Sequence, residues 1–184
     1  MSQLRADAQR NLERVLEAAA EAFAEHGADV SVDEIARRAG VGHATVFRRF
    51  PTKDALLSAV VCKRIDDLAV HAQEALERPD PWEAFCDFVW FAGDVHASDR
   101  ALHDAVGRCA DAPDVAASKA ELDAAVEALI VRAQDAGALR RDVGAEDVSL
   151  LVGSAIKATM QSADPDAWRR YVGVVLDGLR AQFG

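Results

Sequence analysis

Apolar residues recur along this chain every three to four positions, the spacing that places them on one face of an α-helix. Val15, Ala19, Ala22 and Phe23 follow this spacing in the first segment, and Gly27 supplies a helix stop. No alternating pattern of useful length indicates a β-strand, so we expect an all-α protein. The expected helices cover about residues 7–25, 32–39, 43–50, 52–77, 82–96, 99–110, 114–136, 145–162 and 165–182.

Two of the expected helices are short and are joined by a glycine-containing turn. Ser31, followed three residues later by Glu34, forms a capping-box pattern at the start of the first, and Gly40 ends it. Pro51 stops the second. Helices joined in this way can cross at a steep angle and leave the second exposed along one side. The segment therefore predicts a helix-turn-helix.

The second helix of this pair carries the candidate chemistry. At about 100° per residue, Val46 and Phe50 fall together and face inward, and the opposite side is small, polar and cationic. Small residues let the backbone approach base edges, hydroxyls bond to them, and cationic side chains neutralise phosphates. The free backbone N–H groups expected at Thr52 and Lys53 also favour a phosphate.

The charge distribution supports this interpretation only in the first third of the chain. The formal net charge is −10, from 21 basic and 31 acidic residues, which argues against a polyanion as partner of the whole chain. Residues 31–64, however, hold 7 basic and 3 acidic side chains. A basic block beside an acidic body indicates a division of labour between two parts.

Three ordered segments, Ser31–Val41, Thr45–Phe50 and Thr52–Leu56, resemble the DNA-binding domain of TetR/AcrR-family transcriptional regulators. The resemblance covers about residues 8–60 closely. It implies an N-terminal three-helix DNA-binding domain at residues 1–52 and a helical effector-binding and dimerisation domain at residues 53–184. It also implies a ligand-responsive repressor that binds a palindromic operator of double-stranded DNA as a homodimer and is released by a small-molecule effector.

The resemblance also implies which residues contact DNA. The family most often has Tyr where this chain has Phe47, so a phosphate-contacting hydroxyl is absent and we expect the ring to pack against the sugar–phosphate backbone. For Arg37 and Arg38, a DNA contact and a solvated basic face remain equally open. The expected contacts are Ser31, Gly42, His43, Ala44, Thr45, Phe47, Arg48, Arg49, Thr52 and Lys53.

Beyond residue 60 the family is similar in architecture rather than in sequence. Its members are homodimers whose last two long helices pair in a four-helix bundle, and the last two apolar stripes of this chain are wider than a surface helix of a monomer needs. The expected interface residues are Val148, Leu151, Val152, Ala155, Trp168, Val172, Val175, Leu176 and Leu179.

An aromatic-rich segment in the middle of the chain has two interpretations. Such residues usually form core, but family members commonly hold an effector between the middle helices, and some of this set then lines the cavity. The candidate effector-binding residues are Trp82, Phe85, Val89, Trp90, His96, His103 and Cys109. The spacing of His96, His103 and Cys109 is not a recognised ligand pattern, so we expect no metal.

Other classes of function find little support. No nucleophile elbow, P-loop or dinucleotide-binding motif is present, so we expect neither an enzyme nor a cofactor. The chain has no apolar run long enough for a membrane span, no secretory signal and no cysteine-pair motif, which favours a cytoplasmic protein without a membrane partner. Cys62 beside Lys63 is either a redox sensor or an inert thiol. The alternatives are a helical small-molecule-binding or enzymatic domain with a degenerate DNA head, an activator, and a nonspecific architectural protein.

Overall fold

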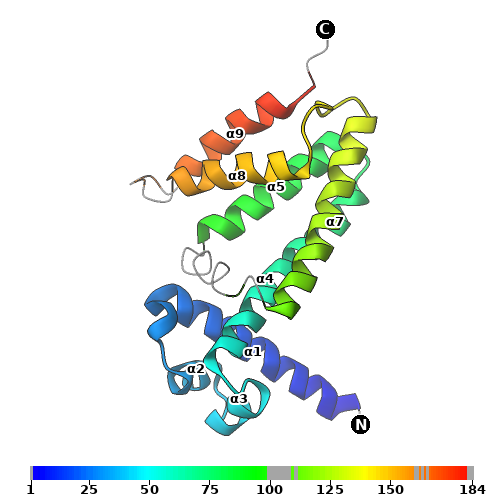
Figure 1. Ribbon diagram of the computed structural model, residues 1–184. Helices are drawn as coiled ribbons and strands as arrows, with labels where there is room; N and C mark the ends of the chain where they lie inside the picture. Colours follow the sequence, from blue (N-terminus) through cyan, green and yellow to red (C-terminus); the bar gives the residue numbers. More distant parts are fainter. Residues whose placement is uncertain are drawn as a thin grey trace. The chain divides into compact units, whose positions relative to one another are not determined.

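The computed structural model describes residues 2–98, 109, 112–159, 162, 164 and 166–181. The described chain is helical, and the expected all-α fold is confirmed (Figure 1). The helix expected at residues 99–110 lies outside the described residues except for Cys109. The helices are α1 (Ser2–His26), α2 (Val32–Ala39), α3 (His43–Arg49), α4 (Lys53–Leu76), α5 (Pro81–Ser98), α7 (Pro113–Asp135), α8 (Ala145–Thr159) and α9 (Ala167–Leu179), with a short 3-10 turn at Gly27–Asp29.

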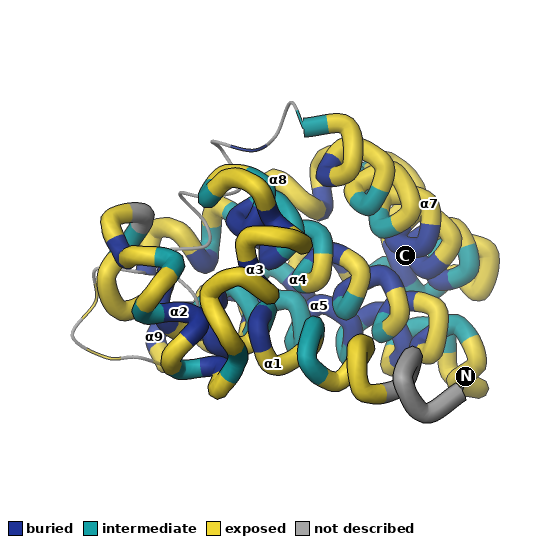
Figure 2. The backbone as a smooth tube through the Cα atoms, turned by 90° about the horizontal axis from the view of Figure 1, so that it is seen from below, coloured by how far each residue is buried: buried dark blue, intermediate teal, exposed yellow. Residues whose placement is uncertain are grey.

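Chain contacts divide the molecule into two compact units. The first comprises residues 1–65 and 99–118, and in it α1 packs against α2 and α2 against α3. Val15, Ala19, Ala22 and Phe23 are all buried there, as their spacing predicts. Figure 2 shows buried stretches alternating with exposed ones along the helices. The apolar face of α1 therefore faces the two short helices.

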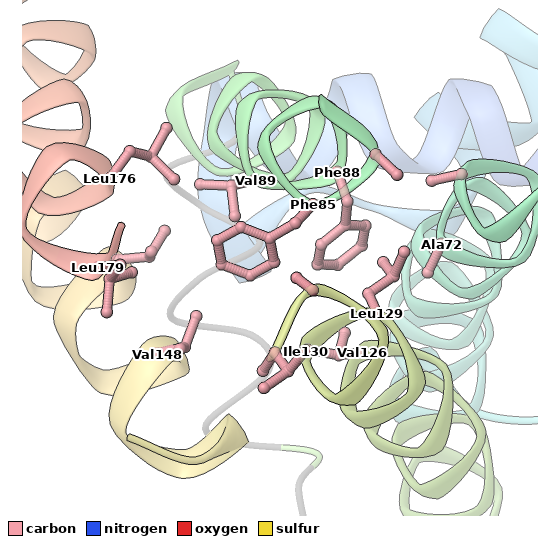
Figure 3. Packing of buried hydrophobic residues seen from close by; sticks show 14 of the residues in the cluster. Ala72, Phe85, Phe88, Val89, Val126, Leu129, Ile130, Val148, Leu176 and Leu179 are labelled. Carbon is pink, nitrogen blue, oxygen red and sulfur yellow. The ribbon is translucent and has the colours of Figure 1, made fainter. Parts of the chain in front are cut away.

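The second unit comprises residues 66–98 and 119–184. Here α5 packs against both α8 and α9, which also pack against each other. Figure 3 shows the core, where Phe85 and Phe88 of α5 meet side chains of α4, α7, α8 and α9. Phe85 is fully buried. The aromatic helix is thus the centre of this unit.

Two features differ from the sequence-based expectations. The contact-based division falls within α4, after Ile65, whereas the expected boundary lies before Lys53; α4 itself is unbroken. The last helix ends at Leu179 because the chain turns there and pairs with the segment after α7. The backbone N–H of Arg140 donates to the carbonyl of Leu179 (3.0 Å), and that of Ala181 donates to Ala138 (2.9 Å). Periodicity along one helix carries no information about such a long-range pairing.

Candidate nucleic-acid interface

A cap orders the start of α2, and a glycine and an arginine hold the turn between α2 and α3. The Ser31 hydroxyl accepts a hydrogen bond from the Glu34 N–H (3.2 Å), as the capping box predicts. Gly40 has φ +63°, a left-handed conformation that favours glycine. Arg14 of α1 donates from Nη2 to the Ala39 carbonyl, and a Cβ added to Gly40 would lie 2.6 Å from that nitrogen. The direction in which α3 leaves the turn is therefore fixed from two sides.

The orientation of α3 follows its helical periodicity. Val46 and Phe50 are buried, as predicted, and the Phe50 N–H donates to the Val46 carbonyl (2.8 Å) at the end of the helix. The remaining residues of α3 are all exposed, and Gly42 precedes them in an extended conformation. The exposed residues are His43, Ala44, Thr45, Phe47, Arg48 and Arg49.

A second cap begins the next helix. The Thr52 hydroxyl accepts from the Ala55 N–H (3.1 Å) and remains able to donate its own hydrogen outward. Lys53 is the first residue of α4 and is half-buried. The Thr52–Lys53 junction is therefore ordered by its own hydrogen bond, and its polar groups lie close in sequence to the exposed arginines of α3.

The basic residues of this unit form two groups with different surroundings. Arg37 contacts Glu34 (2.6 Å), and Arg38 contacts both Glu34 (2.8 Å) and Glu25 (2.8 Å). Their charges are largely matched by acidic partners. In contrast, within the described residues the other group, Arg48, Arg49 and Lys53, forms no ion pair. Of the two interpretations of Arg37 and Arg38, a DNA contact is therefore the less favoured, because both side chains are engaged by acids within the protein.

The ion-pair network perturbs the acids that take part in it. Hydrogen bonds from Arg37 and then Arg38 lower the pKa of Glu34 from 4.5 to about 2. The hydrogen bond from Arg38 lowers the pKa of Glu25, and the two carboxylates raise the pKa of Arg38 above its usual value. Because Glu25 belongs to α1 and Glu34 to α2, this network joins two helices of the first unit.

The lowered pKa of Glu34 predicts that the stability of the first unit decreases in acid. A carboxyl group whose pKa is lower in the folded than in the unfolded state stabilises the fold at any pH above its unfolded-state pKa. That contribution is lost as the pH falls toward the folded-state pKa. The loss should therefore occur between about pH 4.5 and about pH 2, the interval between the two pKa values. Chemical denaturation across this interval should show a smaller pH dependence for Glu34→Gln than for the parent. Equal slopes for the two proteins would contradict the assignment.

A groove between α1 and α3 adds residues that sequence reasoning missed. It has a volume of about 530 Å³, and its apolar wall includes Leu12 and Val46. Gln9 and Asn11 of α1 line the same groove as the exposed residues of α3. Nothing in the sequence signals them, because their proximity to α3 depends on tertiary packing. The candidate surface accordingly extends beyond the helix-turn-helix, with Thr45, Arg48 and Arg49 at its rim.

Comparison with known proteins identifies the family of this chain. Residues 15–60 match the family described as bacterial regulatory proteins, tetR family, and residues 80–181 match the SbtR-like C-terminal domain of transcriptional regulators. The chain belongs to the TetR family of transcriptional regulators. The resemblance recognised in the helix-turn-helix is confirmed, and the second match extends it to the C-terminal half.

Solved structures and a sequence relative agree with this assignment. The TetR transcription regulatory protein from Mycobacterium vanbaalenii is 40% identical, with a TM-score of 0.72 over 96% of this chain and 99% of that one. TetR transcriptional regulator SCO0520 from Streptomyces coelicolor is 27% identical, with a TM-score of 0.78 over 94% and 99%. An HTH-type transcriptional regulator of Mycobacterium tuberculosis is 30% identical over 155 residues, which cover 82% of this chain and 80% of the relative.

The expected effector-binding residues of this TetR-family chain fall in different surroundings. Phe85 and Val89 are buried in the core of the second unit, whereas Trp82, Trp90 and His96 are half-buried. Trp82 lies under the Arg180 guanidinium, 5.4 Å from the ring centroid, and Trp90 meets Trp168 at 5.9 Å between centroids. Two candidates are set apart: Cys109 is buried in the first unit, and His103 lies outside the described residues.

The expected interface residues also divide by burial. Val148, Val152, Trp168, Val172, Leu176 and Leu179 are buried. Their side chains belong to the hydrophobic core of the second unit. Ala155 and Val175 are half-buried, and Leu151 is exposed. The exposed large apolar residues of α8 and α9 are Leu150, Leu151, Tyr171 and Val174.

No described helix is both long enough and apolar enough to cross a membrane. No group of three metal-ligating side chains comes together among the described residues. Cys62 is half-buried on α4, and burial raises the pKa of the Cys86 thiol to about 11, which keeps that sulfur protonated near neutral pH.

Proposed function

We propose that this TetR-family regulator is a repressor that binds a palindromic operator as a homodimer and releases it when a small molecule binds. The observation that carries the DNA-binding part is the contrast between the two groups of cations. Within the described residues Arg48, Arg49 and Lys53 form no ion pair, at and just after the exposed helix of a helix-turn-helix, while Arg37 and Arg38 are paired with acids. Unpaired cations on such a surface are available to phosphates, whose neutralisation dominates affinity for DNA.

The base-reading part of the proposal rests on the small residues between those cations. Ala44 and Thr45 are exposed at the start of α3, where the backbone can approach base edges closely. Val46 holds this surface outward because its side chain is almost completely buried beneath it. A helix presented in this way fits the major groove, as in other helix-turn-helix proteins.

The homodimer is supported by the exposed apolar side chains of the last two helices. Leu150 is 68% exposed on α8 and Val174 is 72% exposed on α9, and these two helices pack against each other. Leu151 and Tyr171 extend the same two helices' exposed apolar surface. Exposed apolar side chains gathered on neighbouring elements mark interaction sites. A second copy is the occupant that the family's architecture supplies, and a two-fold dimer matches a palindromic operator.

Release by an effector is proposed through α4. This helix runs without a break from Lys53 to Leu76, so it begins beside the DNA-binding residues and continues into the unit that holds the aromatic core. An effector that binds one conformation of the second unit better than another must increase the population of the conformation that it prefers. Because α4 is continuous, that shift can reach the DNA-binding residues. A typical coupling of about 1–3 kcal/mol changes operator affinity about 5–150-fold. Trp82, Trp90 and His96 remain the candidates for contacting an apolar or planar effector.

The DNA-binding proposal predicts a difference between two arginines. Arg48→Ala should weaken binding to the DNA upstream of the protein's own gene and reduce the slope of log affinity against log salt by about one unit, because one phosphate contact is lost. Arg37→Ala is the matched control, because its guanidinium already pairs with Glu34. It should leave the slope unchanged. Fluorescence anisotropy at several salt concentrations measures both.

Two results would contradict the proposal. Equal losses of slope in the two variants would mean that the paired and unpaired arginines are equivalent toward DNA. Footprinting that reveals no discrete protected site would indicate a nonspecific architectural protein instead. Lys53→Ala tests the junction with α4 in the same assay, and an unchanged affinity would remove that residue from the interface.

A further inference from the structure

An acidic residue is bonded to the first residue of the recognition helix. Asp33, in the first turn of α2, contacts Nδ1 of His43 through its Oδ1 atom. Both side chains are at the surface, 76% and 47% exposed respectively. An ionised carboxylate only accepts hydrogen bonds, so the ring nitrogen that faces it must carry the proton. The free nitrogen of a neutral His43 is then Nε2, with its lone pair available.

The face of the same ring is held by a neighbour one turn along α3. His43 and Phe47 stack with ring centroids 4.7 Å apart and planes inclined by 17°. Phe47 is itself 45% exposed. The imidazole is therefore fixed at one edge by a carboxylate and on one face by an aromatic ring. The edge that carries Nε2 is the one left to contact another molecule. The stack also gives Phe47 a role that needs no hydroxyl.

A carboxylate at a surface that meets DNA has an electrostatic cost, because phosphates repel it. Asp33 contacts the first residue of α3, the helix on which Arg48 and Arg49 are exposed and form no ion pair with any described residue. Its hydrogen bond to His43 gives the carboxylate a function that offsets this cost. In other proteins a carboxylate that accepts a hydrogen bond from one ring nitrogen of a histidine fixes the tautomer and the orientation of that ring in the same way.

We propose that Asp33 is a positioning residue that holds His43 with Nε2 as an acceptor, so that His43 selects a base with an exocyclic amino group. In the major groove such a donor is offered by N6 of adenine and N4 of cytosine, whereas guanine and thymine offer acceptors at the corresponding edge. The selection of bases rests on the proposed function. The tautomer of His43 does not, because it is a property of the protein alone.

The first experiment reads the tautomer without DNA. Nitrogen-15 NMR of the imidazole ring at about pH 8, where an unperturbed histidine is neutral, should show His43 protonated at Nδ1. A freely rotating histidine favours the Nε2-protonated form. Asp33→Asn should shift His43 toward that form, because an amide can donate to Nδ1 as well as accept from it. Protonation at Nε2 in the parent protein would overturn the positioning role whether or not the protein binds DNA.

The second experiment reads base selection. Parent, Asp33→Asn and Asp29→Asn proteins select operators from a randomised half-site at the same pH. Asp29 is the matched control, because it is an exposed acid of the same unit and its removal changes the net charge equally. The parent and Asp29→Asn should enrich adenine or cytosine at one position. Asp33→Asn should reduce that preference by about threefold to tenfold, the range of one hydrogen bond.

The outcomes separate the two proposals. Identical base preferences in all three proteins would overturn base selection by His43. A uniform gain in affinity in both Asn variants would mean that Asp33 acts only through its charge. Selection of no site by any protein, together with an Nδ1-protonated His43, would count against the proposed function and against base selection but leave the positioning of His43 by Asp33 intact.

Discussion

Replacing Val174 by aspartate is expected to convert the protein from a dimer to a monomer and to weaken operator binding by about 10²–10⁴-fold. Val174 is 72% exposed on α9, among the apolar residues proposed to meet a second copy. A carboxylate buried there without a partner is strongly unfavourable, and a two-fold axis introduces it twice. The loss of affinity follows because two linked DNA-binding domains bind one palindrome with an avidity that separate domains lack. Sedimentation velocity and anisotropy measure the two effects.

The matched control for this variant is Val131→Asp. Val131 is 43% exposed on α7, outside the two helices proposed to form the interface. The same carboxylate at this position should leave both the sedimentation coefficient and the operator affinity unchanged. Val174→Asp that still sediments as a dimer would refute the α8–α9 interface. A monomer that retains full operator affinity would refute the link between dimerisation and DNA binding.

The arrangement of the helix-turn-helix was predictable from the sequence because its determinants are local. The Ser31 cap and the Gly40 stop depend on neighbours within one or two turns, and the helical spacing of Val46 and Phe50 places both on the face that is buried. Capping and helical periodicity are expressed at that range, so the outward side of α3 could be read directly. The segments that resemble the TetR family are the same ones, since the residues that fix this geometry also define the family pattern.

The last two helices illustrate what periodicity leaves undetermined. The stripe containing Val152 and Val172 was correctly identified as apolar, but it packs into the core of its own subunit. A helical stripe gives the buried face and not the identity of what covers it. The residues left exposed, such as Leu150 and Val174, became apparent only when the protomer's own packing was known.

The division of the basic residues also required tertiary structure. In the sequence Arg38 and Arg48 belong to one basic block, and for Arg38 the sequence left a DNA contact and a solvated face equally open. Packing of α1 against α2 brings Glu25 within 2.8 Å of Arg38, although the two residues are 13 positions apart in the sequence and belong to different helices. Arg48 has no such partner within the described part of the chain. Net charge over a segment therefore overstated the number of cations available to DNA.

Replacing Gly93 by alanine is expected to destabilise the second unit by about 1–3 kcal/mol, the usual effect of overpacking a filled core. Gly93 is buried on α5, and an added Cβ would lie 2.1 Å from Cζ3 of Trp168 and 2.7 Å from its Cη2. Trp168 of α9 cannot easily withdraw, because it is 4% exposed and its ring also meets Trp90. For a chain of this size the melting temperature should fall by about 2–4 °C per kcal/mol.

Gly153→Ala provides the matched control, because a Cβ at that helical glycine of α8 meets no atom within 4 Å. It should leave stability unchanged or raise it by up to about 1 kcal/mol, since alanine is the better helix former. The clash predicts in addition that Gly93→Ala and Trp168→Leu are coupled, so that the double variant loses less stability than the sum of the two single losses. Additive losses would mean that the methyl group is accommodated elsewhere. A Gly93→Ala protein as stable as the parent would show that α5 and α9 can separate at this point.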